Sequence, residues 1–232
     1  LAAYEEILRR AEALPGVTAA AAAGALPFDG TRSQVVFTAE GSEADDRSKV
    51  PTSQFNSASA KYFDVMGIRM LSGRTFNDHD TTAGAPVVIV SESIARRSWP
   101  GEDAIGKRLH FGPPDVKNPT WLTVVGVVED MRNRRVEEDP KPTLYRPLKQ
   151  TSSLSLSLVL KTEADPGTLR GPLAGAVRAV DRDLPTFGVR SMQEMLATAT
   201  ASRRFSTQLL TAFAALALTL AAVGIYGVMA FV

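Results

Sequence analysis

FSTQLLTAFAALALTLAAVGIYGVMAFV, at residues 205–232, contains no charged side chain. A helix of about 20 apolar residues is long enough to cross a hydrocarbon layer of about 30 Å. Core helices of globular proteins are usually about 10–14 residues long, and the Ala and Gly of this stretch are common in membrane helices. The stretch therefore predicts a C-terminal transmembrane helix. The alternative is the buried central helix of a soluble protein.

The apolar stretch continues a longer helical pattern. No Pro or Gly interrupts residues 191–223, so we expect one uninterrupted helix to run from the preceding domain into the membrane. A stiff helix transmits displacement between a domain and a bilayer, whereas a flexible linker does not. Arg203 and Arg204 precede the stretch, and we expect them at the lipid headgroups or in a helical stalk above the membrane.

Composition excludes several classes of protein. The chain has 232 residues, a formal net charge of +1 and no cysteine. A near-neutral charge argues against nucleic acid as the main partner, because phosphate binding requires a basic surface. The lack of cysteine excludes disulfides, thiolate metal sites and cysteine nucleophiles. Residue Leu1 is followed by no signal segment, so we expect the chain to begin inside a longer polypeptide.

Residues before 191 follow a mixed pattern typical of an α+β protein. Ser59 and Ser91 are predicted helix N-caps, and Gly67 is a predicted C-cap. We place residues 70–74 in a turn, and residues 144–147 at a sheet edge because proline cannot donate to a ladder. The predicted helices cover residues 2–14, 59–66, 91–99 and 165–180. The predicted strands cover residues 17–25, 33–39, 50–57, 86–90, 105–111, 121–128, 144–147, 154–160 and 184–189.

No enzyme motif is present in the sequence. It lacks a P-loop, a GxGxxG, a GxSxG and an HExxH motif. Its two histidines, His79 and His110, lie far apart in the sequence. The loop at residues 77–80, NDHD, is the best metal candidate by residue type, but an ordinary solvated loop explains it better. We therefore predict no catalytic, cofactor-binding or metal-binding residues and no cofactor.

We also expect structural rather than functional roles for the charged clusters and for the two tryptophans. The carboxylates at residues 129–130 and 137–139 are expected on solvated loops, because nothing indicates a cleft around them. The arginines at residues 132, 134 and 135 are expected in a solvated loop, with phosphate or lipid headgroups as the alternative contact. Trp99 and Trp121 are expected in the core or between subdomains.

Five sequence blocks follow one another in the chain: YFDVMGI at 62–68 with LSGRTF at 71–76 and Asp80, PVVIVSE at 86–92, WPGEDAIGKRL at 99–109, VVGVVED at 124–130 and LYRPL at 144–148. In this order they resemble the MacB-like periplasmic core domain of ABC transporter permeases. The end of the chain, from RF at 204–205 through FAALAL at 213–218 to GIYGVM at 224–229, is similar to the start of an FtsX-like permease segment.

This resemblance implies a two-subdomain α+β fold and a transport role. A porter-like subdomain would comprise residues 1–57 and 151–201, an inserted mixed α/β subdomain residues 58–150, and the permease segment residues 202–232. The family implies a non-catalytic part of a mechanotransmission-type permease in the bacterial inner membrane, with most of this chain on the periplasmic side. It would couple ATP hydrolysis by a separate cytoplasmic ABC ATPase to periplasmic movement for export or efflux.

The resemblance also implies partners: membrane lipid, the ATPase, a second permease copy in a homodimer, and a periplasmic adaptor or substrate, but no nucleic acid. The alternative function is a membrane-anchored sensor or binding domain without transport, and a third possibility is a soluble enzyme. We expect Gly67, Gly73, Gly106 and Gly126 in turns or close approaches. We expect Arg74 to pair with a carboxylate and tie the inserted segment together.

Overall fold

The computed structural model describes residues 2–27, 33–41, 50–131, 141–152, 155–184 and 188–229. The chain divides into two compact units, Leu1–Val189 and Arg190–Val232. All of the strands described lie in the first unit, and the second unit contains one long helix.

Helices of the first unit form where the sequence predicts them. The predicted helix at 165–180 is divided into a 3₁₀ turn and an α-helix, and Asp165 caps the turn by accepting a 2.9 Å hydrogen bond from the Gly167 N–H. The helices are α1 (Ala2–Glu12), α2 (Tyr62–Met66), α3 (Glu92–Ser98), α4 (Arg170–Arg178), and the 3₁₀ turns η2 (Leu148–Gln150) and η3 (Pro166–Leu169).

Eight of the nine predicted strands are present. In the predicted strand at 184–189, residues 184, 188 and 189 form no strand and residues 185–187 lie outside the described part of the chain. The strands are β1 (Val17–Ala23), β2 (Gln34–Ala39), β3 (Thr52–Ala58), β4 (Met70–Gly73), β5 (Val87–Ser91), β6 (Arg108–Phe111), β7 (Leu122–Val128), β8 (Thr143–Pro147) and β9 (Ser157–Thr162).

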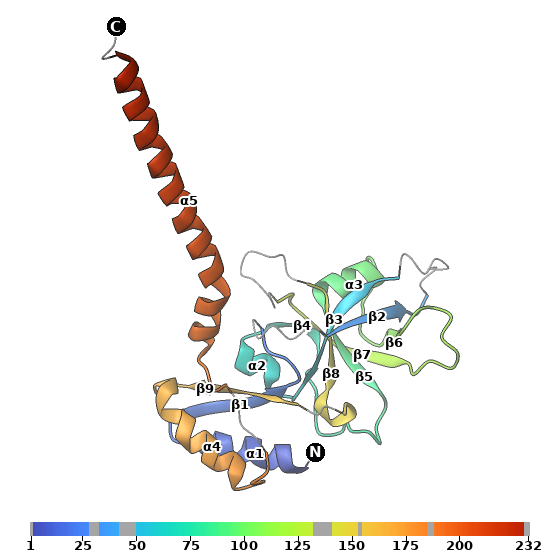
Figure 1. Ribbon diagram of the computed structural model, residues 1–232. Coiled ribbons are helices and arrows are strands. Elements are labelled where there is room, and N and C mark those ends of the chain that lie inside the picture. Colours follow the sequence, from blue (N-terminus) through green and yellow to red (C-terminus); the bar gives the residue numbers. More distant parts are fainter. Residues whose placement is uncertain are drawn as a thin grey trace. The chain divides into compact units, whose positions relative to one another are not determined.

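Six of these strands form a closed ring, which Figure 1 shows together with the helices around it. The pairing order is β2-β6-β7-β5-β8-β3, and β2 also pairs with β3, which closes the ring. The β5–β7 and β3–β8 pairs are parallel, and the other pairs within the ring are antiparallel. β4 extends the ring from β7, while β1 and β9 extend it from β3. Ring closure leaves fewer backbone groups unpaired than an open sheet would.

Apolar side chains form one core in the ring and a second beside it. β5 is buried along its whole length, as is typical of a central strand with both faces covered, and it has a parallel neighbour in β7 and an antiparallel one in β8. The first core includes Phe37, Leu109 and Trp99, so the prediction of a core position for Trp99 is confirmed. The second core joins α2 to the ring, where the rings of Phe63 and Tyr145 meet edge to face at 5.2 Å.

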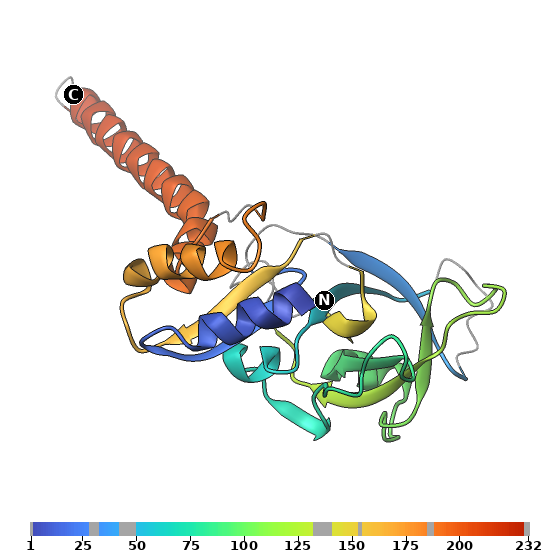
Figure 2. The same ribbon diagram turned by 90° about the horizontal axis from the view of Figure 1, so that it is seen from below.

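The two ends of the first unit form a layer of their own. α1 and α4 lie along one side of the β1–β9 pair, and Figures 1 and 2 show this from two directions. Side chains of all four elements share a third core that includes Ala11, Ala20 and Leu173, with Leu158 and Leu160 packed against it. β2, in contrast, contributes Phe37 to the ring core. The division into residues 1–57 with 151–201 and residues 58–150 stays a prediction.

Two predictions that concern the sheet were wrong: the turn at residues 70–74 and the edge position of residues 144–147. Residues 70–73 form β4, not a turn, and they pair with β7 through a register shift between Met70 and Ser72. The local turn signal comes from Gly73, whose φ of 76° lies at the end of the strand. The predicted edge strand at 144–147 is β8, which lies between β5 and β3. Pro147 is tolerated there because it is the last residue of the strand, where the ladder ends.

The predicted helix caps had mixed outcomes. Gly67 is the C-cap of α2 in the left-handed conformation, as predicted. Ser59 was wrong as an N-cap, because α2 begins only at Tyr62 and the Ser59 Oγ accepts a 3.0 Å hydrogen bond from the Ala22 N–H. Ser91 occupies the N-cap position of α3 without capping it. Its Oγ instead accepts from the Thr143 N–H at 3.0 Å, so both hydroxyls stabilise contacts between strands.

The second unit is helix α5 (Met192–Met229), whose 38 residues are continuous as predicted. Its first turn contains a reciprocal capping box. The Ser191 N–H donates to the Glu194 Oε2 at 2.9 Å, and the Glu194 N–H donates to the Ser191 Oγ at 3.1 Å. In the part of the chain that the structure describes, no helix combines the length and apolar character needed to cross a membrane. The transmembrane prediction is therefore not confirmed.

Two of the predicted close-approach glycines face each other across β4 and β7. Gly73 is the register partner of Gly126. A Cβ on Gly73 would lie 2.3 Å from the Val125 carbonyl oxygen, and a Cβ on Gly126 would lie 2.5 Å from the Arg74 carbonyl oxygen. Both contacts are with backbone, which cannot move aside without breaking the ladder. The prediction that these positions require glycine is confirmed.

We predict that Gly73→Val destabilises the domain more than Gly101→Val does. Both glycines have positive φ, but a Cβ on Gly101 has no atom within 4 Å. The control change should cost about 1–3 kcal/mol for backbone strain, and Gly73→Val should add about 1–3 kcal/mol of overpacking. Urea denaturation measures both free energies of unfolding. Equal losses would show that the β4–β7 approach is not tight.

Candidate functional site

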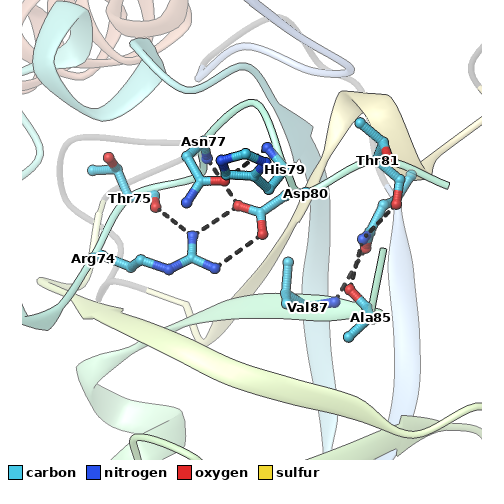
Figure 3. Close-up of polar contacts among 9 residues, drawn as sticks. Arg74, Thr75, Asn77, His79, Asp80, Thr81, Ala85 and Val87 are labelled. Atoms are coloured by element: carbon cyan, nitrogen blue, oxygen red, sulfur yellow. Dashed lines mark hydrogen bonds and ion pairs between the residues drawn. The ribbon is translucent and has the colours of Figure 1, made fainter. Parts of the chain in front are cut away.

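The candidate functional site is the braced loop, residues 74–86, which joins β4 to β5. Figure 3 shows its polar contacts. The Arg74 guanidinium donates to both carboxylate oxygens of Asp80, at 2.8 and 2.9 Å, and to the Thr75 carbonyl oxygen at 3.0 Å. The Asp80 side chain is only 5% exposed, and the Asn77 N–H donates to it at 2.8 Å. This two-point ion pair is the carboxylate contact predicted for Arg74, and it closes the loop.

Electrostatics favour the ionised form of Asp80. Burial raises the pKa of its carboxyl, but the hydrogen bonds from Arg74 and from the Asn77 N–H outweigh burial and hold the pKa below its ordinary value. The hydrogen bonds to Asp80 raise the pKa of Arg74. The pair therefore stays charged at neutral pH, and its charge-assisted bonds are of the stronger kind.

The metal candidate at residues 77–80 forms part of this brace. The Asn77 Oδ1 accepts from the His79 N–H at 2.9 Å, which makes a local turn. Both oxygens of Asp80 already accept hydrogen bonds. Within the described ranges, no three His, Asp or Glu side chains are grouped as metal ligands. The loop is therefore built around an ion pair and a side-chain-to-backbone turn.

Two residues after β8 fasten the braced loop from outside. The Gln150 amide donates to the Thr81 and Ala85 carbonyl oxygens, at 3.1 and 2.8 Å, and accepts from the Val87 N–H at 3.1 Å. The adjacent Lys149 Nζ contacts the Asp78 Oδ1 at 3.0 Å and the Glu5 Oε1 of α1 at 2.8 Å. Its hydrogen bonds to these carboxylates raise the pKa of Lys149.

Sequence reasoning missed Lys149 and Gln150. They lie more than 60 residues from their partners in the braced loop, and a single sequence contains no signal for such a contact. The position of β8 beside β5 brings them there, and the edge-strand prediction did not say which strand β8 would pair with.

The other candidate side chains take structural positions. Asp130 accepts hydrogen bonds from the Ser93 N–H and Oγ at the start of α3, and Glu129 pairs with Arg69. His110 is buried and meets the Trp121 ring edge to face at 4.8 Å. Predictions for residues 132–140, which include the arginine cluster and the carboxylates at 137–139, fall outside the described residues. The described carboxylates thus hold elements together.

We predict that Asp80→Asn lowers the free energy of unfolding by about 1–3 kcal/mol at pH 7, because it removes charge-assisted bonds to a buried group. Since the folded pKa of Asp80 is lowered, its stabilisation is present above its unfolded value of about 3.9 and is lost as pH falls through the folded pKa. Denaturation of both proteins from pH 7 to pH 3 should show the difference shrinking below about pH 4.

Glu102→Gln is the matched control, because Glu102 pairs with Lys107 on the surface and is 59% exposed. Its effect should stay within about 1 kcal/mol. If Asp80→Asn behaves like this control at pH 7, the Arg74–Asp80 pair does not stabilise the loop.

A family profile and a full-length relative match the chain over most of its length, and a second relative matches about a third of it. The profile of the MacB-like periplasmic core domain matches residues 2–180. The macrolide export ATP-binding/permease protein MacB of Neisseria gonorrhoeae is 23% identical over 202 residues, covering 83% of this chain and 30% of that protein. The probable syringafactin export ATP-binding/permease protein SyfD of Pseudomonas syringae is 36% identical over 81 residues, 34% of this chain and 11% of that protein.

Solved structures confirm the fold. The periplasmic region of MacB from Actinobacillus actinomycetemcomitans has a TM-score of 0.52 at 17% identity, over 75% of this chain and 72% of that one. The extracellular domain of the ABC-type transporter YknZ from Gram-positive bacteria has a TM-score of 0.50 at 17% identity, over 75% and 82%. The chain spans about a third of the length of the MacB relative. Because the family profile covers most of the first unit, the chain belongs to the MacB-like periplasmic core domain family.

Proposed function

We propose that this chain is the periplasmic part of an ABC transporter permease that relays ATP-driven movement from the cytoplasm for export or efflux. The ATPase would be a separate domain or subunit, since the chain has no P-loop. The MacB and SyfD relatives carry both activities in their names. A second permease copy, membrane lipid and a periplasmic adaptor or substrate are the partners that we propose with it. The protein would reside in the bacterial inner membrane.

The observation that carries this proposal is the character of α5. Among the side chains that the structure describes, its far part exposes seven large apolar ones, including Leu218 at 72% and Tyr226 at 77%. Burying one such side chain is worth about 1.5–3 kcal/mol, so leaving all seven in water would forgo on the order of 10 kcal/mol, comparable to the stability of a whole domain. The neighbouring residues to 232 add no charge. We propose that lipid covers this surface and that residues 202–232 begin the permease segment.

The near part of α5 supports the relay. The helix begins at a capping box and continues without Pro or Gly as far as residue 223. A helix rises about 1.5 Å per residue and stays stiff over this length, so tilting of its membrane end displaces its capped end.

We predict that the whole chain floats with liposomes, whereas a version ending at Ser202 stays in the aqueous fraction as a folded domain. Leu218→Lys in the whole chain is the matched control. A lysine at the centre of a membrane helix costs about 2.5–3.5 kcal/mol, so this variant should bind liposomes less. Flotation of lipid mixtures with each protein measures the bound fraction. If the whole chain remains in water without detergent and the short version unfolds, α5 is a core helix and the permease proposal fails.

A further inference from the structure

We propose that the chain-end layer, defined as α1, β1, β9 and α4, tilts as a unit about a short pivot and is clasped to the rest of the first unit by two ion pairs from α1. The use of this movement in transport rests on the proposed function, but the movement itself does not. The argument depends on how firmly the layer holds together, how it joins the ring, and what α1 contacts.

The chain-end layer is internally well connected. β1 pairs with β9 at six register positions, from Val17↔Thr162 to Ala23↔Ser157. α1 adds Leu8 and Ala11 to the third core, Leu14 adds to it from the turn before β1, and α4 adds Leu173. A strand pair with a shared apolar core resists internal deformation, so the layer is expected to move without changing shape.

The junction between the layer and the ring is short. Among the described residues, the β1–β3 ladder has one register pair, Ala23↔Ala58. Backbone bonds flank it, from the Gly24 N–H to the Ser57 carbonyl oxygen and from the Ser59 N–H to the Ala22 carbonyl oxygen, both at 2.8 Å. These bonds gather at the C-terminal end of β1, which is the geometry of a pivot rather than of a continuous sheet.

Apolar contact across the junction uses mainly small side chains. β1 presents Ala21 and Ala23 to the second core, where α2 contributes Tyr62 and Phe63. Val159 of β9 is the larger side chain of the layer that packs against the same core. Methyl groups project little from the strand, so they do not interlock with the aromatic rings as long side chains would. This surface permits small shearing movements while it stays buried.

Ion pairs hold both ends of α1 to the segment beyond β3. The Lys61 Nζ, just before α2, lies 2.5 Å from the Glu12 Oε1 at the last residue of α1. The Lys149 Nζ contacts the Glu5 Oε1 near the start of α1 at 2.8 Å. Glu5 and Glu12 are seven positions apart, about 10 Å along the helix axis. Two attachments this far apart set the tilt of α1, which one attachment would leave free.

The clasp is weaker than the core that it restrains. Lys61 is 59% exposed and Glu5 is 50% exposed, and exposed ion pairs are weak and screened by salt. Lys149 also contacts Asp78 of the braced loop. If Glu5 is released, Lys149 still contacts Asp78. The braced loop therefore keeps this ion pair while the chain-end layer moves.

Hydrogen exchange of the whole chain in detergent tests the clasp. In the double variant Glu5→Gln/Glu12→Gln, exchange of the pivot amides at Gly24 and Ser59 should accelerate about 2-fold to 30-fold, the range spanned by two exposed ion pairs. Amides of the β1–β9 ladder should keep their protection. High salt should accelerate the pivot amides of the unmodified chain and have little further effect on the double variant.

Glu6→Gln is the control, because Glu6 lies on α1 but pairs with Arg9 and Arg10 of the same helix. It should leave the pivot amides unchanged. The charge exchange Glu12→Lys/Lys61→Glu should restore part of the protection lost in Glu12→Gln. The clasp is refuted if the double variant exchanges like the unmodified chain, or if the β1–β9 ladder loses protection equally, since the layer would then unfold rather than tilt. Neither result alters liposome flotation, which tests the proposed function separately.

Discussion

The pairing of β1 with β9 is the constraint on which the rest of the first unit depends. It joins strands at opposite ends of the unit, as the 2.8 Å hydrogen bond from Thr162 Oγ1 to the Gly16 carbonyl oxygen shows. The chain between β1 and β9 must therefore begin and end at neighbouring positions, and the closed six-stranded ring allows it to do so. Loop-closure entropy rises only slowly with length, so a large insertion between paired strands is tolerated if it folds into its own core.

Local signals in the sequence predicted the elements but not their arrangement. The left-handed cap at Gly67 and the close approach at Gly73 follow from residue type, and the structure confirms them. The central place of β8 was missed because Pro147 suggested an edge, although a proline at the last position breaks no ladder bond. The Arg74 ion pair was expected without its partner, and Asp80 became identifiable only when the loop closed.

In the proposed relay the domain would work by movement rather than by chemistry, and the polar contacts fit that role. The Arg74–Asp80 pair joins two residues of the braced loop itself, and the Gln150 amide binds the loop from the segment after β8. The Glu5–Lys149 and Glu12–Lys61 pairs join α1 to elements that follow β3. Buried, multiply bonded groups give rigid parts, and exposed single pairs give adjustable contacts between them. The proposed relay of movement through a stiff helix would require both rigid parts and adjustable contacts between them.

The most direct test of the relay uses the full-length permease with its ATPase in lipid nanodiscs. Ala197 is exposed in α5, and Ala197→Pro would break the helix at a cost of about 3 kcal/mol, whereas Ala197→Ser keeps it. Hydrogen exchange of residues 2–189 is measured with and without ATP. The account predicts an ATP-dependent change in the unmodified protein and in Ala197→Ser that is lost in Ala197→Pro. A change of full amplitude in Ala197→Pro would contradict it.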